Sequence, residues 1–167
     1  NLKNGRDINF ATASFGHGIS ITPIELINAV SAIANKGILM RPYILADKIP
    51  ETIQQIITRG TAGTVTKMIV SAVKKNVAAD ISNYSVAGKT GTAYIPDFIN
   101  GGYTDDVINT FVGFAPASDA KFTILIKLDK PAGAPFAGLT VAPAFRSLAQ
   151  FILNYYNIAP DELGISD

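Results

Sequence analysis

The stretch S-V-A-G-K-T-G-T-A-Y-I-P, residues 85–96, marks the point where the apolar pattern of the sequence changes from helical to extended. Before it, apolar residues recur every three or four positions, whereas from here on β-forming residues and alternation dominate. The pattern predicts strands at residues 85–95, 107–116 and 121–129. The segment P-A-S-D-A-K, residues 116–121, predicts a tight turn between the last two strands.

Helical segments lie on both sides of these strands in the sequence. Residues 22–37 begin T-P-I-E, a capping-box start with proline at the first position, and Gly37 supplies a left-handed stop. Apolar spacing predicts two further helices, at residues 61–76 and 141–156, the last with Pro143 in its first turn. The apolar side expected for this last helix consists of Ala144, Leu148, Phe151, Ile152 and Tyr155. Strands in series between helices predict an α/β protein of the α+β type, an antiparallel sheet flanked by helices.

The remaining segments carry weaker signals. Residues 1–10 show neither a targeting pattern nor an obvious first element. The segment 96–106 is too long for a simple hairpin turn, and the acidic tail at 158–167 is expected to be loosely held. We therefore expect one domain over residues 1–157 followed by a tail.

Composition restricts the class of protein. With 167 residues, 48% apolar and 16% charged, the chain suits one globular domain and excludes a disordered one. A net charge of +1 gives no field that would attract nucleic acid. The absence of cysteine excludes disulfides and thiolate metal sites, and no apolar run is long enough to cross a membrane.

Lys89, at the centre of the opening stretch, admits three interpretations. A phosphate-binding loop is excluded, because Asn83 replaces its first glycine and the following G-T-A-Y-I-P cannot open a helix. A solvated lysine on an edge strand is the default for an arbitrary sequence. The third is a carboxylate receptor, with charge from Lys89, hydroxyls from Thr90 and Thr92, and backbone exposed by Gly91. Strand alternation puts the lysine and the threonines on opposite faces, so this interpretation requires a twist or an edge position.

The stretch V-A-G-K-T-G-T-A, residues 86–93, resembles the third motif of the penicillin-binding transpeptidases, a family with the motifs S-x-x-K, S-x-N and K-T-G. Three other segments are similar to the family in order and spacing, over residues 11–156: F-G-H-G-I-S-I-T-P with its helix, T-F-V-G-F-A-P-A, and G-L-T-V-A-P-A-F-R-S-L-A-Q-F-I-L. Alanine at position 93 is more like the class B enzymes of cell elongation, division or sporulation.

This resemblance implies a function and a set of site residues. Lys89 and Thr92 would be catalytic, the first by assisting proton transfer and the second by donating its backbone N–H to the oxyanion. Thr90, Gly91 and Thr92 would bind the carboxylate of a D-alanyl-D-alanine stem peptide or of a β-lactam. The family implies no metal or cofactor, an extracytoplasmic location, a parent anchored by an N-terminal transmembrane helix, and cell-division or elongation proteins as possible partners.

The nucleophile that the family requires does not appear in the sequence. Two strings match S-x-x-K, Ser71–Lys74 and Ser118–Lys121, but the first comes too close before Lys89 and the second falls in a turn. No S-x-N occurs. We therefore expect the C-terminal part of a transpeptidase domain, inactive without the N-terminal part of the same domain. Two alternatives stay open: a penicillin-binding-like module that has lost catalysis and serves as a scaffold or muropeptide sensor, and a carboxypeptidase or β-lactamase with a related fold.

Other polar residues give weaker indications. His17, the only histidine, lies in a glycine-rich turn and is expected to have a structural role rather than to act as a base. Asp97, Asp105 and Asp106 fit no calcium-loop template and are interpreted as solvated loop carboxylates. A final group consists of Tyr94 and Tyr103, either at a cleft rim or packed on the sheet, and Arg41, expected to pair at the surface.

Overall fold

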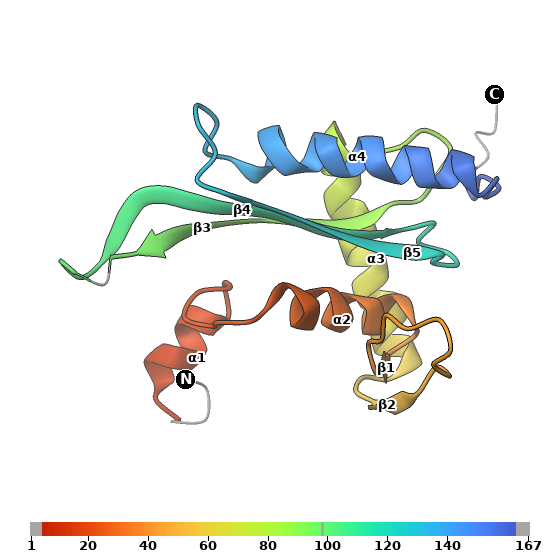
Figure 1. Ribbon diagram of the computed structural model, residues 1–167, viewed down its shortest axis with the longest axis horizontal. Coiled ribbons are helices and arrows are strands. Elements are labelled where there is room, and N and C mark those ends of the chain that lie inside the picture. Colours follow the sequence, from red (N-terminus) through yellow and green to blue (C-terminus); the bar gives the residue numbers. More distant parts are fainter. Residues whose placement is uncertain (1–4, 98, 163–167) are drawn as a thin grey trace.

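The computed structural model describes residues 5–97 and 99–162, and its centre is an antiparallel sheet of three strands (Figure 1). The strands are β3 (Ala87–Pro96), β4 (Tyr103–Ala115) and β5 (Phe122–Asp129). Their order is β3-β4-β5, so β4 is central and β3 lies at one edge. The predicted antiparallel sheet is confirmed, with boundaries shifted by a few residues.

Helices cover both faces of this sheet. The helix α4 (Ala137–Tyr155) lies along one face, and α2 (Pro23–Ala34) lies on the opposite side (Figure 1). The helix α3 (Arg59–Lys75) contacts both β3 and α2, and a short 3₁₀ helix, η2 (Val77–Ala79), follows it. None of the helices in the described ranges is long and apolar enough to cross a membrane.

The start and stop of α2 follow the sequence signals. The Oγ1 of Thr22 accepts from the N–H of Glu25, whose carboxylate accepts from the N–H of Thr22 at 2.7 Å, a complete capping box. These hydrogen bonds, first from the backbone and then from the hydroxyl of Thr22, lower the pKa of Glu25. After the helix Gly37 takes a φ of +91°, and a Cβ there would lie 2.1 Å from the carbonyl oxygen of Ile57. Only glycine fits this stop.

The helix α4 differs from its prediction in two ways. It begins at Ala137, so Pro143 lies inside the helix rather than in its first turn. The predicted apolar side is also wrong, because Leu148, Phe151 and Tyr155 are exposed. The buried residues of α4 are Ala137, Val141, Ala142, Phe145, Ala149 and Leu153. Apolar residues occur on both sides of this helix, so their spacing alone does not identify the side that packs.

A short first helix and a second sheet were not expected from the sequence. A short helix, α1 (Asp7–Ala13), precedes α2, and β2 (Thr52–Gln55) pairs with β1 (Ile38–Met40) as a separate two-stranded sheet. The connection between β3 and β4 is shorter than predicted because β4 begins at Tyr103, which pairs with Pro96. The resulting hairpin extends beyond the helices (Figure 1).

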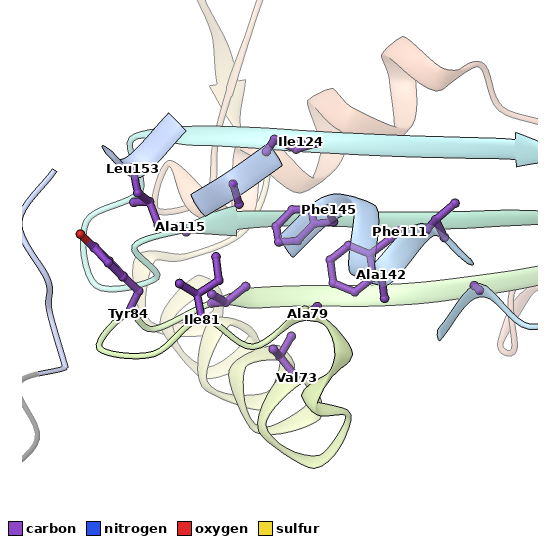
Figure 2. Packing of buried hydrophobic residues seen from close by; sticks show 14 residues of the cluster. Val73, Ala79, Ile81, Tyr84, Phe111, Ala115, Ile124, Ala142, Phe145 and Leu153 are labelled. Atoms are coloured by element: carbon purple, nitrogen blue, oxygen red, sulfur yellow. The ribbon is translucent and has the colours of Figure 1, made fainter. Parts of the chain in front are cut away.

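The main core lies between α4 and the sheet. The ring of Phe111 on β4 meets the ring of Phe145 on α4 with centroids 4.5 Å apart (Figure 2). Ile81 and Tyr84, from the segment that leads into β3, extend the same cluster, and Ile124 joins it from β5. Burial of these side chains fixes α4 on the sheet, since each buried large apolar side chain contributes about 1.5–3 kcal/mol.

Part of the C-terminal tail is held firmly, which corrects the expectation of a loose tail. The carboxylate of Asp161 accepts from the N–H of Ser85 at 2.7 Å, from the Ser85 hydroxyl and from the Ser118 hydroxyl at 2.5 Å. The Tyr84 hydroxyl donates to the carbonyl oxygen of Ile158 at 2.6 Å. These contacts join the tail to the residues just before β3. Residues 163–167 of the predicted tail lie outside the described residues.

Candidate active site

The K-T-G residues lie on β3, at the free edge of the sheet. Lys89 is opposite Val112 on β4, Gly91 is opposite Thr110, and Thr92 is opposite Asn109. Because only β4 pairs with β3, the other edge of β3 has no neighbouring strand within the described residues. The edge position that the carboxylate interpretation requires is therefore present.

The backbone of β3 presents specific groups to that edge. In an antiparallel pair, residues alternate between turning both N–H and C=O toward the partner strand and turning both away. The carbonyl oxygen of Ala87 points toward β4, because it lies 2.6 Å from the place that a Cβ on Gly113 would occupy. By alternation Thr90 and Thr92 turn their N–H and C=O outward. The C=O of Thr90 indeed accepts a hydrogen bond from the Lys89 side chain.

Lys89 brings a positive charge to this edge. Its Nζ donates to the carbonyl oxygen of Thr90 at 2.8 Å and lies 3.5 Å from the Thr90 hydroxyl. The side chain is exposed and forms no ion pair within the described part of the chain. Its charge is consequently available to an anion at the edge of β3.

Gly91 is required by its neighbour on β4. A Cβ at this position would lie 2.5 Å from the Oγ1 of Thr110. The group that approaches this glycine closely is thus a threonine hydroxyl of the next strand.

Thr92 connects the edge to the start of α4. Its hydroxyl oxygen accepts a hydrogen bond from the N–H of Ala137, the first residue of α4, at 3.3 Å. The first turn of α4 contains no acidic residue and has no side-chain cap. The partial positive charge of this helix end is therefore not neutralised by an acidic residue of its own first turn, and it lies next to the Thr92 hydroxyl.

Asn109 is a residue of this region that sequence reasoning missed. It is completely buried, its Nδ2 donates to the Thr140 hydroxyl at 3.0 Å, and its Oδ1 has no partner in the described residues. The sequence held a usable signal. In V-I-N-T-F, residues 107–111, Asn109 occupies an inward position between two buried apolar residues. A polar residue in that pattern requires a buried partner.

Ser71 and Lys74 do not form a nucleophile and base. The ammonium group of Lys74 binds the carboxylates of Glu162 at 2.8 Å and Asp80 at 3.0 Å. The hydrogen bond to Glu162 raises the pKa of Lys74, partial burial opposes this, and the bond to Asp80 adds to it. A lysine held in its charged form cannot accept a proton from a serine.

Both side chains of the second S-x-x-K string also have other partners. The Ser118 hydroxyl donates to Asp161, and Lys121 is paired with Asp119. Ser71 and Ser118 both line a cavity of about 1000 Å³ between α2, α3 and the β4–β5 turn. None of the residues of β3 lines that cavity, so it is separate from the K-T-G edge.

The contacts of His17 and Asp97, two further candidates, indicate structural roles. The ring of His17 lies 5.3 Å from that of Phe15 and 6.1 Å from that of Tyr103, in the turn after α1. Asp97 accepts from the N–H groups of Ile99 and Asn100. The hydrogen bonds from Asn100, backbone first and then side chain, and that from Ile99 lower the pKa of Asp97.

Two other candidate charges, Asp106 and Arg41, lie in surface pairs. Asp106 pairs with Lys130 at 2.8 Å and Arg41 with Glu51 at 2.7 Å, the surface pairing expected for Arg41. Tyr94 and Tyr103 are both exposed. Across residues 5–97 and 99–162 no group of three metal-ligating side chains comes together.

Comparison of the sequence identifies related proteins. The family model of the penicillin binding protein transpeptidase domain matches residues 1–150. The peptidoglycan D,D-transpeptidase FtsI of Escherichia coli K12 is 33% identical over 167 residues, which cover 96% of this chain and 28% of FtsI. The chain thus spans less than a third of the length of this curated relative.

Solved structures share the backbone arrangement. The transpeptidase domain of Burkholderia pseudomallei penicillin-binding protein 3 superimposes with a TM-score of 0.83 at 32% identity, over 96% of this chain and 50% of that one. Penicillin-binding protein 3 of Mycobacterium tuberculosis in complex with ampicillin gives a TM-score of 0.79 at 28% identity, over 93% and 39% of the two chains. The family model, the sequence identity and the backbone agree, and this chain belongs to the penicillin-binding protein transpeptidase domain family, among its class B members.

Proposed function

We propose that residues 87–96 form one wall of the active site of a peptidoglycan D,D-transpeptidase, which cross-links stem peptides by serine acyl transfer. The observation that supports the proposal is the free edge of β3, where the Lys89 ammonium contacts the carbonyl oxygen and hydroxyl of Thr90 and where strand alternation turns the N–H of Thr92 outward. Donors and positive charge gather there, as a carboxylate and an oxyanion require.

Each residue has a separate role in this proposal. The hydroxyls of Thr90 and Thr92 hold the terminal carboxylate of D-alanyl-D-alanine or of a β-lactam, and Gly91 leaves room for it. Lys89 stabilises that negative charge and assists proton transfer. The N–H of Thr92 donates to the oxyanion of the tetrahedral intermediate, and such a donor contributes about 3 kcal/mol to the transition state.

The serine nucleophile of this proposal lies outside residues 1–167. A wall without a nucleophile cannot form an acyl-enzyme, so we expect the 167-residue chain to be inactive alone. The partner it requires is the N-terminal part of the same domain. By analogy with its family we propose that the active protein lies outside the cytoplasm, attached to the membrane by a segment beyond this chain, among proteins of cell division or elongation.

Labelling with a fluorescent penicillin tests this proposal. We expect the full-length gene product to form one stable adduct, on a serine of an S-x-x-K motif, and the 167-residue chain to remain unlabelled. Peptide mapping by mass spectrometry identifies the labelled residue. The Ser71→Ala variant of the full-length product is the matched control, and its labelling should be unchanged.

Two outcomes would contradict the proposal in different ways. Labelling of the isolated chain at Ser71 would place the nucleophile on α3 and remove the need for a second part. A full-length product that binds penicillin reversibly and never forms an adduct would favour the scaffold or muropeptide-sensing module instead.

A further inference from the structure

A series of hydrogen bonds connects the buried Asn109 to Thr92. The Nδ2 of Asn109 donates to the Thr140 Oγ1 at 3.0 Å, and that hydroxyl donates to the carbonyl oxygen of Phe136 at 3.2 Å. This carbonyl belongs to the same peptide group as the N–H of Ala137, which donates to the Thr92 Oγ1 at 3.3 Å. One peptide plane is thus held at its oxygen by Thr140 and at its N–H by Thr92.

All of these hydrogen bonds run in one direction. A threonine hydroxyl has a single proton, and Thr140 uses it on Phe136. Thr140 must therefore accept from Asn109, which identifies the NH₂ group as the end of the amide that faces Thr140. The peptide group of Phe136 and Ala137 then carries the polarisation on to Thr92, because bonds aligned in one direction strengthen each other.

The last bond determines where the Thr92 proton points. The N–H of Ala137 occupies a lone pair of the Thr92 oxygen, so the hydroxyl proton must point away from α4. It has no protein acceptor within residues 5–97 and 99–162. The side chain is exposed at the edge strand, where an incoming anion would meet it.

The geometry points to Asn109 and Thr140 as positioning residues that orient the Thr92 hydroxyl for a substrate carboxylate. This inference rests on the proposed function of the β3 edge. Asn109 begins the series from a fixed position, since its side chain is fully buried between β4 and the first turn of α4. Neither residue touches the substrate, and both act through the start of α4.

A pair of substitutions at Thr140 tests the inference in the full-length gene product. Thr140→Val removes the hydroxyl at nearly constant shape, whereas Thr140→Ser retains it. The rate of acylation is measured with benzylpenicillin and with its methyl ester, which lacks the negative charge. We expect T140V to lower the ratio of the two rates about five- to tenfold and T140S to leave it close to wild type, because one hydrogen bond to the carboxylate is weakened.

Two further variants separate a specific effect from general damage. N109L should lower the same ratio, and the double variant N109L/T140V should lower it no further than the stronger single variant, since both interrupt one series. Gln150→Leu removes a hydrogen bond to Asn154 elsewhere on α4 and should leave the ratio unchanged. If N109L does not fold, the Thr140 pair alone decides the question.

The possible results distinguish this inference from the function on which it rests. If Thr92→Val lowers the ratio and T140V does not, the positioning role is wrong while the proposed role of Thr92 stands. If T140V lowers the rates with both compounds equally, its effect is a general distortion and the inference is also wrong. If Thr92→Val leaves the ratio unchanged, the carboxylate-binding role of the β3 edge itself fails.

Discussion

Gly91 and Thr110 form a close pair across β3 and β4, and the space between them admits no added methyl group. We expect Gly91→Ala to lower the free energy of unfolding by about 1–2 kcal/mol, because the new Cβ must displace the Thr110 hydroxyl. Urea unfolding followed by circular dichroism measures the loss.

The matched control for Gly91→Ala removes the Thr110 hydroxyl that the added Cβ would meet. The double variant Gly91→Ala/Thr110→Ala eliminates the hydroxyl that lies 2.5 Å from the added Cβ, so it should be less destabilised than the sum of the single changes. Strict additivity of the two changes would show that the contact does not constrain Gly91.

Sequence reasoning reaches those residues of the proposed site that are neighbours in the chain. Lys89, Thr90, Gly91 and Thr92 are predicted from the sequence because their side-chain chemistry and strand spacing are local. The contact between Thr92 and Ala137 was not predicted, because 45 residues separate the two partners in the sequence. It depends on where α4 begins, and tertiary packing rather than a local cap sets that boundary.

At the scale of elements, the carboxylate of Asp161 holds the tail against Ser85, just before β3, and against Ser118 in the β4–β5 turn. Partial burial alone raises the pKa of Asp161, but the hydrogen bonds from Ser118 and Ser85 together outweigh it and hold the pKa below the ordinary 3.8. A carboxylate with a lowered pKa stabilises the folded state above its ordinary pKa and loses that contribution as the pH falls through the folded value.

Asp161→Asn should therefore destabilise the chain at pH 7 and much less at pH 3. We expect a loss of about 1–2 kcal/mol at neutral pH, since charge-assisted hydrogen bonds are replaced at a partly exposed site. Urea unfolding at the two pH values measures it. Asp119→Asn, in the same turn but paired with Lys121 in solvent, is the control and should change little. An equal loss for D161N at both pH values would contradict the role of its charge.

Element types were easier to predict than the side on which an element packs. The capping box of α2 and the alternation along the sheet specify helix and strand from adjacent residues. The packing side of α4 was mistaken because the exposed Leu148 and Phe151 are as apolar as the buried Leu153 and Phe145. The choice between the two sides depends on the shape of the sheet, which no single helix encodes.

At the scale of the molecule, α4 presents an apolar stripe to solvent. Leu148, Phe151 and Tyr155 follow one another at helical spacing and are 42%, 62% and 67% exposed. Contiguous apolar surface of this kind favours association. We expect the isolated 167-residue chain to self-associate as its concentration rises, as observed by sedimentation velocity.

Two substitutions test whether the stripe on α4 causes that self-association. Replacing both Phe151 and Tyr155 by serine should shift the chain toward monomer, whereas replacing Ile44, which is 99% exposed outside the stripe, should have little effect. A chain that is monomeric at every concentration, or that responds equally to both changes, would show that the stripe does not drive association.

The Asp161 contact also bears on how the protein is made. The N-terminal part of a chain leaves the ribosome first, so the K-T-G residues emerge well before Asp161. Asp161 is the residue that binds Ser85, just before the same strand. During synthesis β3 exists without this anchor. We therefore expect the wall proposed for this strand to reach its final geometry only after Asp161 has bound Ser85, and a chain truncated before Asp161 to lack this contact at the start of the strand.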